Sequence, residues 1–132
     1  MKNYIIFTVF ILASVLLLQA CANQKQHVNT NVISIEKIID KNAPNHELCS
    51  SLTLTKGDVL KFFSIAKRVS EYEFHHEAII LPCKYQGIIN INGNFLKWEI
   101  MAGGAGYLYN DELINRRYLC KKDCCNVLSN LC

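Results

Sequence analysis

The fold of this chain is decided by residues 85–101, which read YQGIININGNFLKWEIM. Asn92 and Gly93 at the centre tolerate the positive φ angles of a two-residue hairpin turn, and β-branched and aromatic residues flank them. Successive side chains of a strand point to opposite faces of a sheet, so the second half of this stretch has one apolar face. We therefore predict a β-hairpin whose second strand directs three side chains into the core: Leu96, Trp98 and Ile100.

Further strands are predicted on both sides of this hairpin. Residues 72–83 are rich in aromatic and β-branched residues and are predicted to be a strand, whereas residues 32–40 fit either a strand or a short helix. After the hairpin, residues 107–109 and 116–120 are predicted strands, joined by a turn at residues 110–112. Residues 103–106 (GGAG) lack the spacing and the following helix of a phosphate-binding loop, so we expect a bulge or wide loop there.

A helix is predicted over residues 56–67. Thr55 and Asp58 have the spacing of a capping box, and the apolar residues that follow recur at helical intervals. The pattern as a whole predicts an α+β fold. We expect an antiparallel sheet of four or five strands, one or two helices packed on one face, and a C-terminus stapled by disulfides.

The N-terminus has the composition of a secretory signal. Residues 4–18 form an apolar run that follows Lys2 and contains only two polar residues, Thr8 and Ser14. A membrane-spanning helix needs roughly 20 apolar residues, and the run is shorter than that. Residues 22–31 are polar. We therefore predict export with removal of the first twenty residues, the alternative being an uncleaved anchor.

Residues 18–21, Leu-Gln-Ala-Cys, resemble the lipobox of bacterial lipoproteins. The resemblance is carried by Leu18, Ala20 and Cys21, while Gln19 departs from the small residue usual at its position. It implies a diacylglycerol on Cys21 and anchoring by acyl chains such as palmitate. Ala22 after the cysteine implies the outer membrane, facing the periplasm. The alternative is ordinary cleavage after Ala22, which would release a soluble protein.

The sequence thus divides into a signal peptide (residues 1–20), the lipidated cysteine with a polar tether (21–31) and a single α+β domain (32–132). A chain of 132 residues allows one compact domain. The formal net charge of +3 is too small for the phosphate neutralisation that nucleic-acid binding requires, so we expect no nucleic-acid partner. The domain is similar to small Gram-negative lipoproteins of no assigned activity, and this likeness implies none. The sequence leaves the oligomeric state open.

The chain has seven cysteines. With Cys21 acylated, an even set remains in a compartment where disulfides persist: Cys49, Cys83, Cys120, Cys124, Cys125 and Cys132. The adjacent Cys124 and Cys125 would be strained as a pair, so we expect each to bond elsewhere, with Cys49 and Cys83 as the available distant partners. The C-terminal cysteines also suggest a zinc site, but their spacing and export favour disulfides. We expect no metal or other cofactor.

Residues 73–77 (EFHHE) combine imidazole and carboxylate groups, which serve in acid–base catalysis and in metal binding. On a strand, His75 shares a face with Glu73 and Glu77, and His76 lies on the opposite face and is expected to be partly buried. No third ligand follows at a metal-binding spacing. We therefore favour a binding surface that includes Glu73, His75 and Glu77 over a catalytic or metal site.

Four cations lie within seven residues: Arg116, Arg117, Lys121 and Lys122. They could contact anionic lipid or an acidic protein, and we take Arg116 and Arg117 as candidate binding residues. The interpretation that we favour is an edge strand that its charges protect from aggregation.

Two classes of function fit these patterns. The preferred one is a non-enzymatic envelope lipoprotein that binds another envelope protein as an inhibitor, an immunity-type protein or an assembly accessory, because no set of catalytic residues converges. The alternative is a small periplasmic hydrolase or metal-binding protein that uses His75 with Glu73 and Glu77, and recruits His27 or His46.

Overall fold

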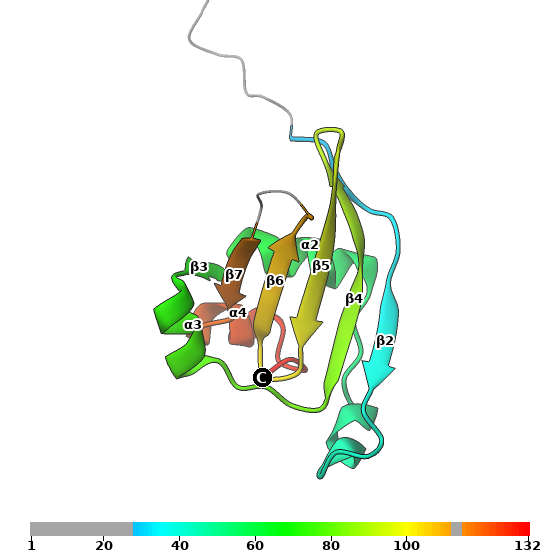
Figure 1. Cartoon of the computed structure of the whole chain (residues 1–132), viewed down its shortest axis with the longest axis vertical. Coiled ribbons are helices and arrows are strands. Elements are labelled where there is room, and N and C mark those ends of the chain that lie inside the picture. The colour runs from blue at the N-terminus through cyan, green and yellow to red at the C-terminus, as the bar shows by residue number, and fades with distance from the viewer. Residues whose placement is uncertain (1–27, 112–114) are drawn as a thin grey trace, which may run out of the picture.

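A sheet of seven strands forms the centre of the molecule (Figure 1). The computed structural model describes residues 28–111 and 115–132, so the predicted signal, Cys21 and His27 lie outside the described residues. The named strands all pair in antiparallel fashion, in the order β1 and β2, β4, β5, β6, β7, β3. They are β1 (Thr30–Val32), β2 (Glu36–Ile39), β3 (Lys67–Val69), β4 (Cys83–Ile91), β5 (Asn94–Met101), β6 (Ala105–Tyr109) and β7 (Asn115–Leu119).

Helices lie on both faces of this sheet. They are the 3₁₀ helix η1 (His46–Ser50), α2 (Lys56–Ile65), α3 (Glu71–Glu77) and α4 (Lys122–Val127). Phe62 of α2 and Cys124 of α4 pack in one core with Trp98. Phe74 of α3 packs in a smaller cluster with Met101, which points to the other face. The predicted α+β fold is confirmed, with more strands than expected and with α3 on the face opposite α2.

The predicted hairpin is confirmed as β4 and β5. Its turn residues Asn92 and Gly93 have φ angles of 52° and 87°, the left-handed values that an Asn-Gly turn requires. The three predicted core side chains are buried, at 4%, 0% and 0% exposure for Leu96, Trp98 and Ile100. The capping box is also present, because the Thr55 hydroxyl accepts from the Asp58 N–H and the Asp58 carboxylate accepts from the Thr55 N–H.

The prediction of a strand over residues 72–83 is wrong. Residues 71–77 form α3, and its N-terminus is capped by Ser70, whose hydroxyl accepts from the Glu73 N–H at 3.1 Å. The aromatic residue that suggested a strand, Phe74, is the one that buries the helix against the sheet. The chain joins the sheet as β4 only at Cys83.

Residues 32–40, which fit either a strand or a short helix from sequence, lie mostly in an edge strand formed by β1 and β2. Val32 pairs with Ile89 and Glu36 with Gln86, so three residues (33–35) oppose two on β4, which is a β-bulge. A side chain at Gly87 would put its Cβ 2.0 Å from the Ser34 carbonyl oxygen, so the bulge needs glycine there. The strand begins at Thr30, inside the stretch predicted as tether.

All six candidate cysteines are paired, as Cys49–Cys83, Cys120–Cys124 and Cys125–Cys132. The adjacent cysteines are not bonded to each other, as predicted. The expectation that Cys49 and Cys83 pair with the C-terminal cysteines is wrong, because η1 lies against the start of β4 and brings these two together. The disulfide-stapled C-terminus is confirmed, since Cys120–Cys124 joins the end of β7 to α4.

The prediction of a bulge or wide loop at residues 103–106 is wrong, because β5 and β6 are joined by a tight turn at residues 102–104 and β6 begins at Ala105. Gly103 and Gly104 have φ angles of 95° and 80°. The Gly103 N–H donates to the Leu131 carbonyl oxygen at 2.7 Å, and a Cβ on Gly104 would lie 2.8 Å from the Cβ of Cys120. The glycines therefore let the C-terminal segment pack closely against this turn.

Candidate functional site

The part of the sheet that α3 leaves uncovered is the candidate site. We call it the open face. Its side chains come from alternate positions of β2, β4, β5 and β6, opposite the Trp98 core. They are Glu36, Lys84, Gln86, Ile88, Phe95, Lys97, Glu99 and Tyr109, and they are bordered by Tyr107, which packs against Phe74 of α3.

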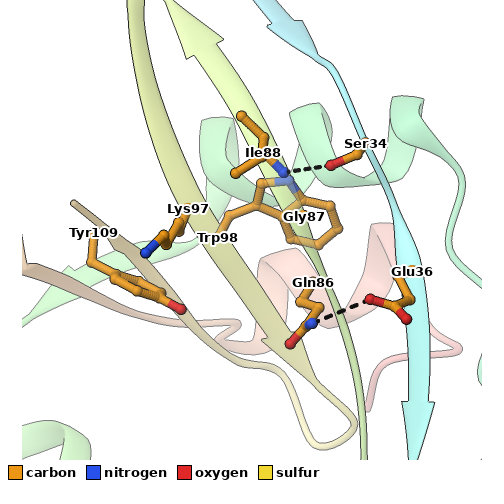
Figure 2. Close-up of a pocket in the computed structure, with 8 residues that line it drawn as sticks. All are labelled: Ser34, Glu36, Gln86, Gly87, Ile88, Lys97, Trp98 and Tyr109. Atoms are coloured by element: carbon orange, nitrogen blue, oxygen red, sulfur yellow. Dashed lines mark hydrogen bonds between the residues drawn. The ribbon is translucent and has the colours of Figure 1, made fainter. Parts of the chain in front are cut away.

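Three hollows of about 300–320 Å³ lie along this face. Figure 2 shows the first, with Glu36 and Gln86 on one side and Lys97 and Tyr109 on the other. Tyr109 also lines the second hollow, beside Tyr107, Asn110 and Asn115. Glu99 lines the second and the third, whose other walls are mostly apolar: Ile38, Ile80, Leu81, Pro82 and Met101. The shared residues join the three hollows into one uneven surface.

Glu99 is the centre of the polar contacts on the open face. The Lys84 ammonium donates to its carboxylate at 2.8 Å, and the Tyr109 hydroxyl donates at 3.0 Å. Burial, followed by the hydrogen bond to Glu99, raises the pKa of Tyr109 above its usual value, and burial raises the pKa of Tyr107. Both phenols therefore stay neutral at physiological pH and can donate hydrogen bonds.

Two further side-chain contacts lie at the borders of the open face. The Gln86 amide donates to Glu36 at 3.3 Å across the edge of the sheet, and Lys97 pairs with Asp111 at 2.8 Å. Lys97 and Glu99 were not among the residues that the sequence predicted to form a site. The signal was present, because the alternation that buries Trp98 puts them together on the other face.

The predicted surface of His75 with Glu73 and Glu77 does not form, because these residues are on a helix. The carboxylate nearest His75 is that of Glu71, one turn away at 3.7 Å, and the His75 side chain is 66% exposed. Glu73 accepts from Lys67 at 3.0 Å, and Glu77 pairs with Lys121. The hydrogen bond from Lys67 lowers the pKa of Glu73, and the hydrogen bond to Glu77 raises the pKa of Lys121.

His76 is exposed, which corrects the expectation of partial burial. Its ring stacks on Tyr72 with centroids 4.0 Å apart, and Nδ1 lies 2.8 Å from the Tyr72 carbonyl oxygen. Helical spacing, rather than strand alternation, brings these two side chains together.

The predicted basic cluster is divided between two faces. Arg117 lies on the α3 side of the sheet and pairs with Glu71 at 3.3 Å, and Lys121 contacts Glu73 and Glu77. Arg116 is the neighbouring strand residue and points to the opposite face. The cations of this segment that pair with α3 hold the helix on the sheet and do not form a single surface with Arg116.

Among the described residues, one group of three metal-ligating side chains has its donor atoms within 4.8 Å of one another, and it consists of Cys120, Cys125 and Cys132. In the same part of the chain, no helix is long and apolar enough to cross a membrane.

Comparisons of the chain with protein-family models, with curated proteins and with solved structures found no match.

Proposed function

We propose that this protein is a lipoprotein of the bacterial envelope, anchored through Cys21 in the outer membrane and facing the periplasm, and that its open face binds another envelope protein without catalysing a reaction. Inhibitors, immunity-type proteins and assembly accessories are the kinds of binding protein that this proposal includes.

The observation that carries the proposal is the row of three adjacent hollows on the open face. The first and second hollows share Tyr109, and the second and third share Glu99. Protein interfaces are enriched in tyrosine and need polar groups whose positions are fixed before binding. Tyr107, Tyr109 and the Lys84–Glu99 pair meet both needs, because they project from the central strands of a seven-stranded sheet. A partner that covers this face would contact a rigid surface and would lose little conformational entropy.

The envelope location is supported by two separate features. One is the lipobox-like sequence that ends at Cys21. The other is the pairing of the remaining six cysteines in disulfides, which persist in oxidising compartments outside the cytoplasm. The alternative function, a hydrolase or metal-binding protein that uses Glu73 and Glu77, is not supported in this way. The carboxylates of both residues already form ion pairs with Lys67 or Lys121.

Site-specific photo-crosslinking of the full chain in its own cells tests the proposal. A photoreactive amino acid is placed at Gln86 or Lys97 on the open face, and the matched control carries it at Val127, which is exposed on α4. We expect one discrete adduct with a second envelope protein from both open-face positions and none from Val127.

The adduct is then measured after Tyr109→Ala combined with Glu99→Ala, which removes the residues shared by the hollows. We expect the adduct from Gln86 to disappear while the protein remains folded by circular dichroism. Equal adducts from Val127 and the open face, or none from either open-face position, would contradict the proposal.

A further inference from the structure

We propose that the four C-terminal cysteines, once reduced, form a tetrathiolate site for a zinc ion. This site is separate from the open face and does not depend on the proposed function. The disulfide state and the zinc state are alternatives, and the supply of a dithiol reductant decides between them.

The geometry of the sulfurs is the first step. The Sγ atoms of Cys120, Cys125 and Cys132 lie within 4.8 Å of one another, and the fourth sulfur, from Cys124, is bonded to Cys120. Zn–S bonds of about 2.3 Å in a tetrahedral site place the sulfurs about 3.8 Å apart. Each bonded pair must therefore separate, and the Cys120 sulfur must approach those of Cys125 and Cys132 by about 1 Å or less. The Cys124 sulfur lies outside this group of three, so its side chain must also move toward Cys125 and Cys132.

The surrounding chain provides room for the sulfurs. Gly104 lies against the cluster, and a side chain there would put its Cβ 2.8 Å from the Cβ of Cys120 and 3.4 Å from the Sγ of Cys132. Its φ of 80° also disfavours other residues. Glycine at this position lets the β5–β6 turn pass close to two of the four sulfurs.

Contacts other than the disulfides hold the segment in place. Leu128 and Leu131 are buried in the main core, and the Leu131 carbonyl accepts from the Gly103 N–H at 2.7 Å. The Asn130 side-chain amide donates to the Thr53 carbonyl oxygen. Because these contacts persist after reduction, the four thiols stay close together, and a metal ion does not need to order the whole segment.

The exposure of the cluster provides the entry point for the reductant. Cys132 is exposed, Cys120 and Cys125 are partly exposed, and only Cys124 is buried. Each disulfide accepts two electrons and two protons from a dithiol, which becomes a disulfide. The four thiols then bind Zn²⁺ as thiolates and release four protons, and the site carries a net charge of −2. Lys122, two residues after Cys120, reduces the cost of that charge, whereas Lys121 is already paired with Glu73 and Glu77.

The Cys49–Cys83 disulfide is the internal control. Both of its cysteines are buried, and neither belongs to the group of neighbouring donors around Cys120. Reduction of this pair provides two thiols, which are too few for a tetrahedral zinc site.

The test is a zinc titration of the full chain, reduced with dithiothreitol and freed of it without oxygen, in competition with a chromogenic chelator. We expect one Zn²⁺ per chain, and we expect Cys125→Ser and Cys132→Ser each to weaken binding by at least about tenfold. The double variant Cys49→Ser, Cys83→Ser is expected to keep the stoichiometry of one.

Cobalt substitution of the reduced wild-type chain keeps the test decisive if a variant does not fold. We expect the thiolate-to-metal charge-transfer and visible bands of tetrahedral Co²⁺. Absence of these bands, failure to bind stoichiometric Zn²⁺, or zinc binding that is unchanged in Cys125→Ser and Cys132→Ser would overturn the proposal.

Discussion

The two faces of the sheet are built from the same strands, yet they differ in what covers them. Side chains on one face pack under α2 and α4 in a single apolar core around Trp98. On the other face, α3 covers only the cluster around Phe74, and the remainder carries polar and aromatic side chains around Glu99. The difference indicates that stability resides mainly on the first face, whereas polar side chains on the second face stay exposed or partly exposed.

The largest expected effect is that of Phe62→Ala on the core face. Phe62 is fully buried, so its truncation should lower the free energy of unfolding by about 3–5 kcal/mol, measured by urea denaturation. The matched control is Phe95→Ala on the open face, where the side chain is 64% exposed and the change should stay within about 0.5 kcal/mol. Equal losses for the two variants would remove the distinction between the faces.

Phe74→Ala should have a smaller and more local effect. Phe74 anchors α3 through the smaller cluster, which includes Met101, Ala105 and Leu119. Because a seven-residue helix can open separately from the sheet, we expect a loss of about 2–3 kcal/mol. Hydrogen exchange should quicken in α3 and stay slow in β5. A uniform increase over both elements would show that α3 and the sheet unfold together.

The attachment of α3 should also weaken in acid. The pKa of Glu73 is lowered below its ordinary value of 4.5, chiefly by the hydrogen bond from Lys67. A lowered pKa in the folded state gives stability that is present above pH 4.5 and is lost as the pH falls through the folded value. The melting temperature, measured between about pH 3 and 6, should therefore change less with pH in Glu73→Gln than in the wild type.

A variant of the partner residue controls this measurement. Lys67→Met should weaken the acid dependence of the wild-type chain and should leave that of Glu73→Gln unchanged. If Lys67→Met alters the slope equally in both backgrounds, the pH dependence does not come from the Lys67–Glu73 pair.

The smallest expected effect is that of Tyr109→Phe on the open face. Removing the hydroxyl that donates to Glu99 should cost about 0.5–1 kcal/mol at pH 7. The pKa of Tyr109 is raised above 10.0, so its contribution is present below pH 10 and is lost as the pH rises through the folded value. Urea denaturation at pH 7 and above pH 10 should show a shallower alkaline decline in the variant than in the wild type.

The sequence predicts the hairpin well because its determinants are local. Asn92 and Gly93 set the turn, and alternation identifies the side chains that face the core. The helix α3 was missed although a local signal for it exists: Ser70 and Glu73 have the spacing of a capping box. The aromatic and β-branched residues that follow outweighed that signal, and the error placed Glu73, His75 and Glu77 on one face.

The candidate site is harder to predict because it depends on contacts between distant segments. One border of the open face is the bulged edge strand. Its bulge packs the Ser34 backbone against Gly87, and these two residues are more than fifty positions apart in the sequence. The cysteine pairing depends in the same way on η1 lying beside β4. The sequence identifies the residues that can take part, and the tertiary structure selects which of them meet.

The first described residues of the domain are tied to the hairpin turn. Asn92 donates to the Asn29 carbonyl at 2.9 Å, and the Asn29 N–H donates back to the Asn92 side chain at 2.9 Å, while the C-terminus lies at the other end of the molecule (Figure 1). With an acyl group on Cys21, the seven residues from Ala22 to Val28 would span at most about 25 Å. The hairpin turn, and with it one end of the open face, would then stay within that distance of the bilayer.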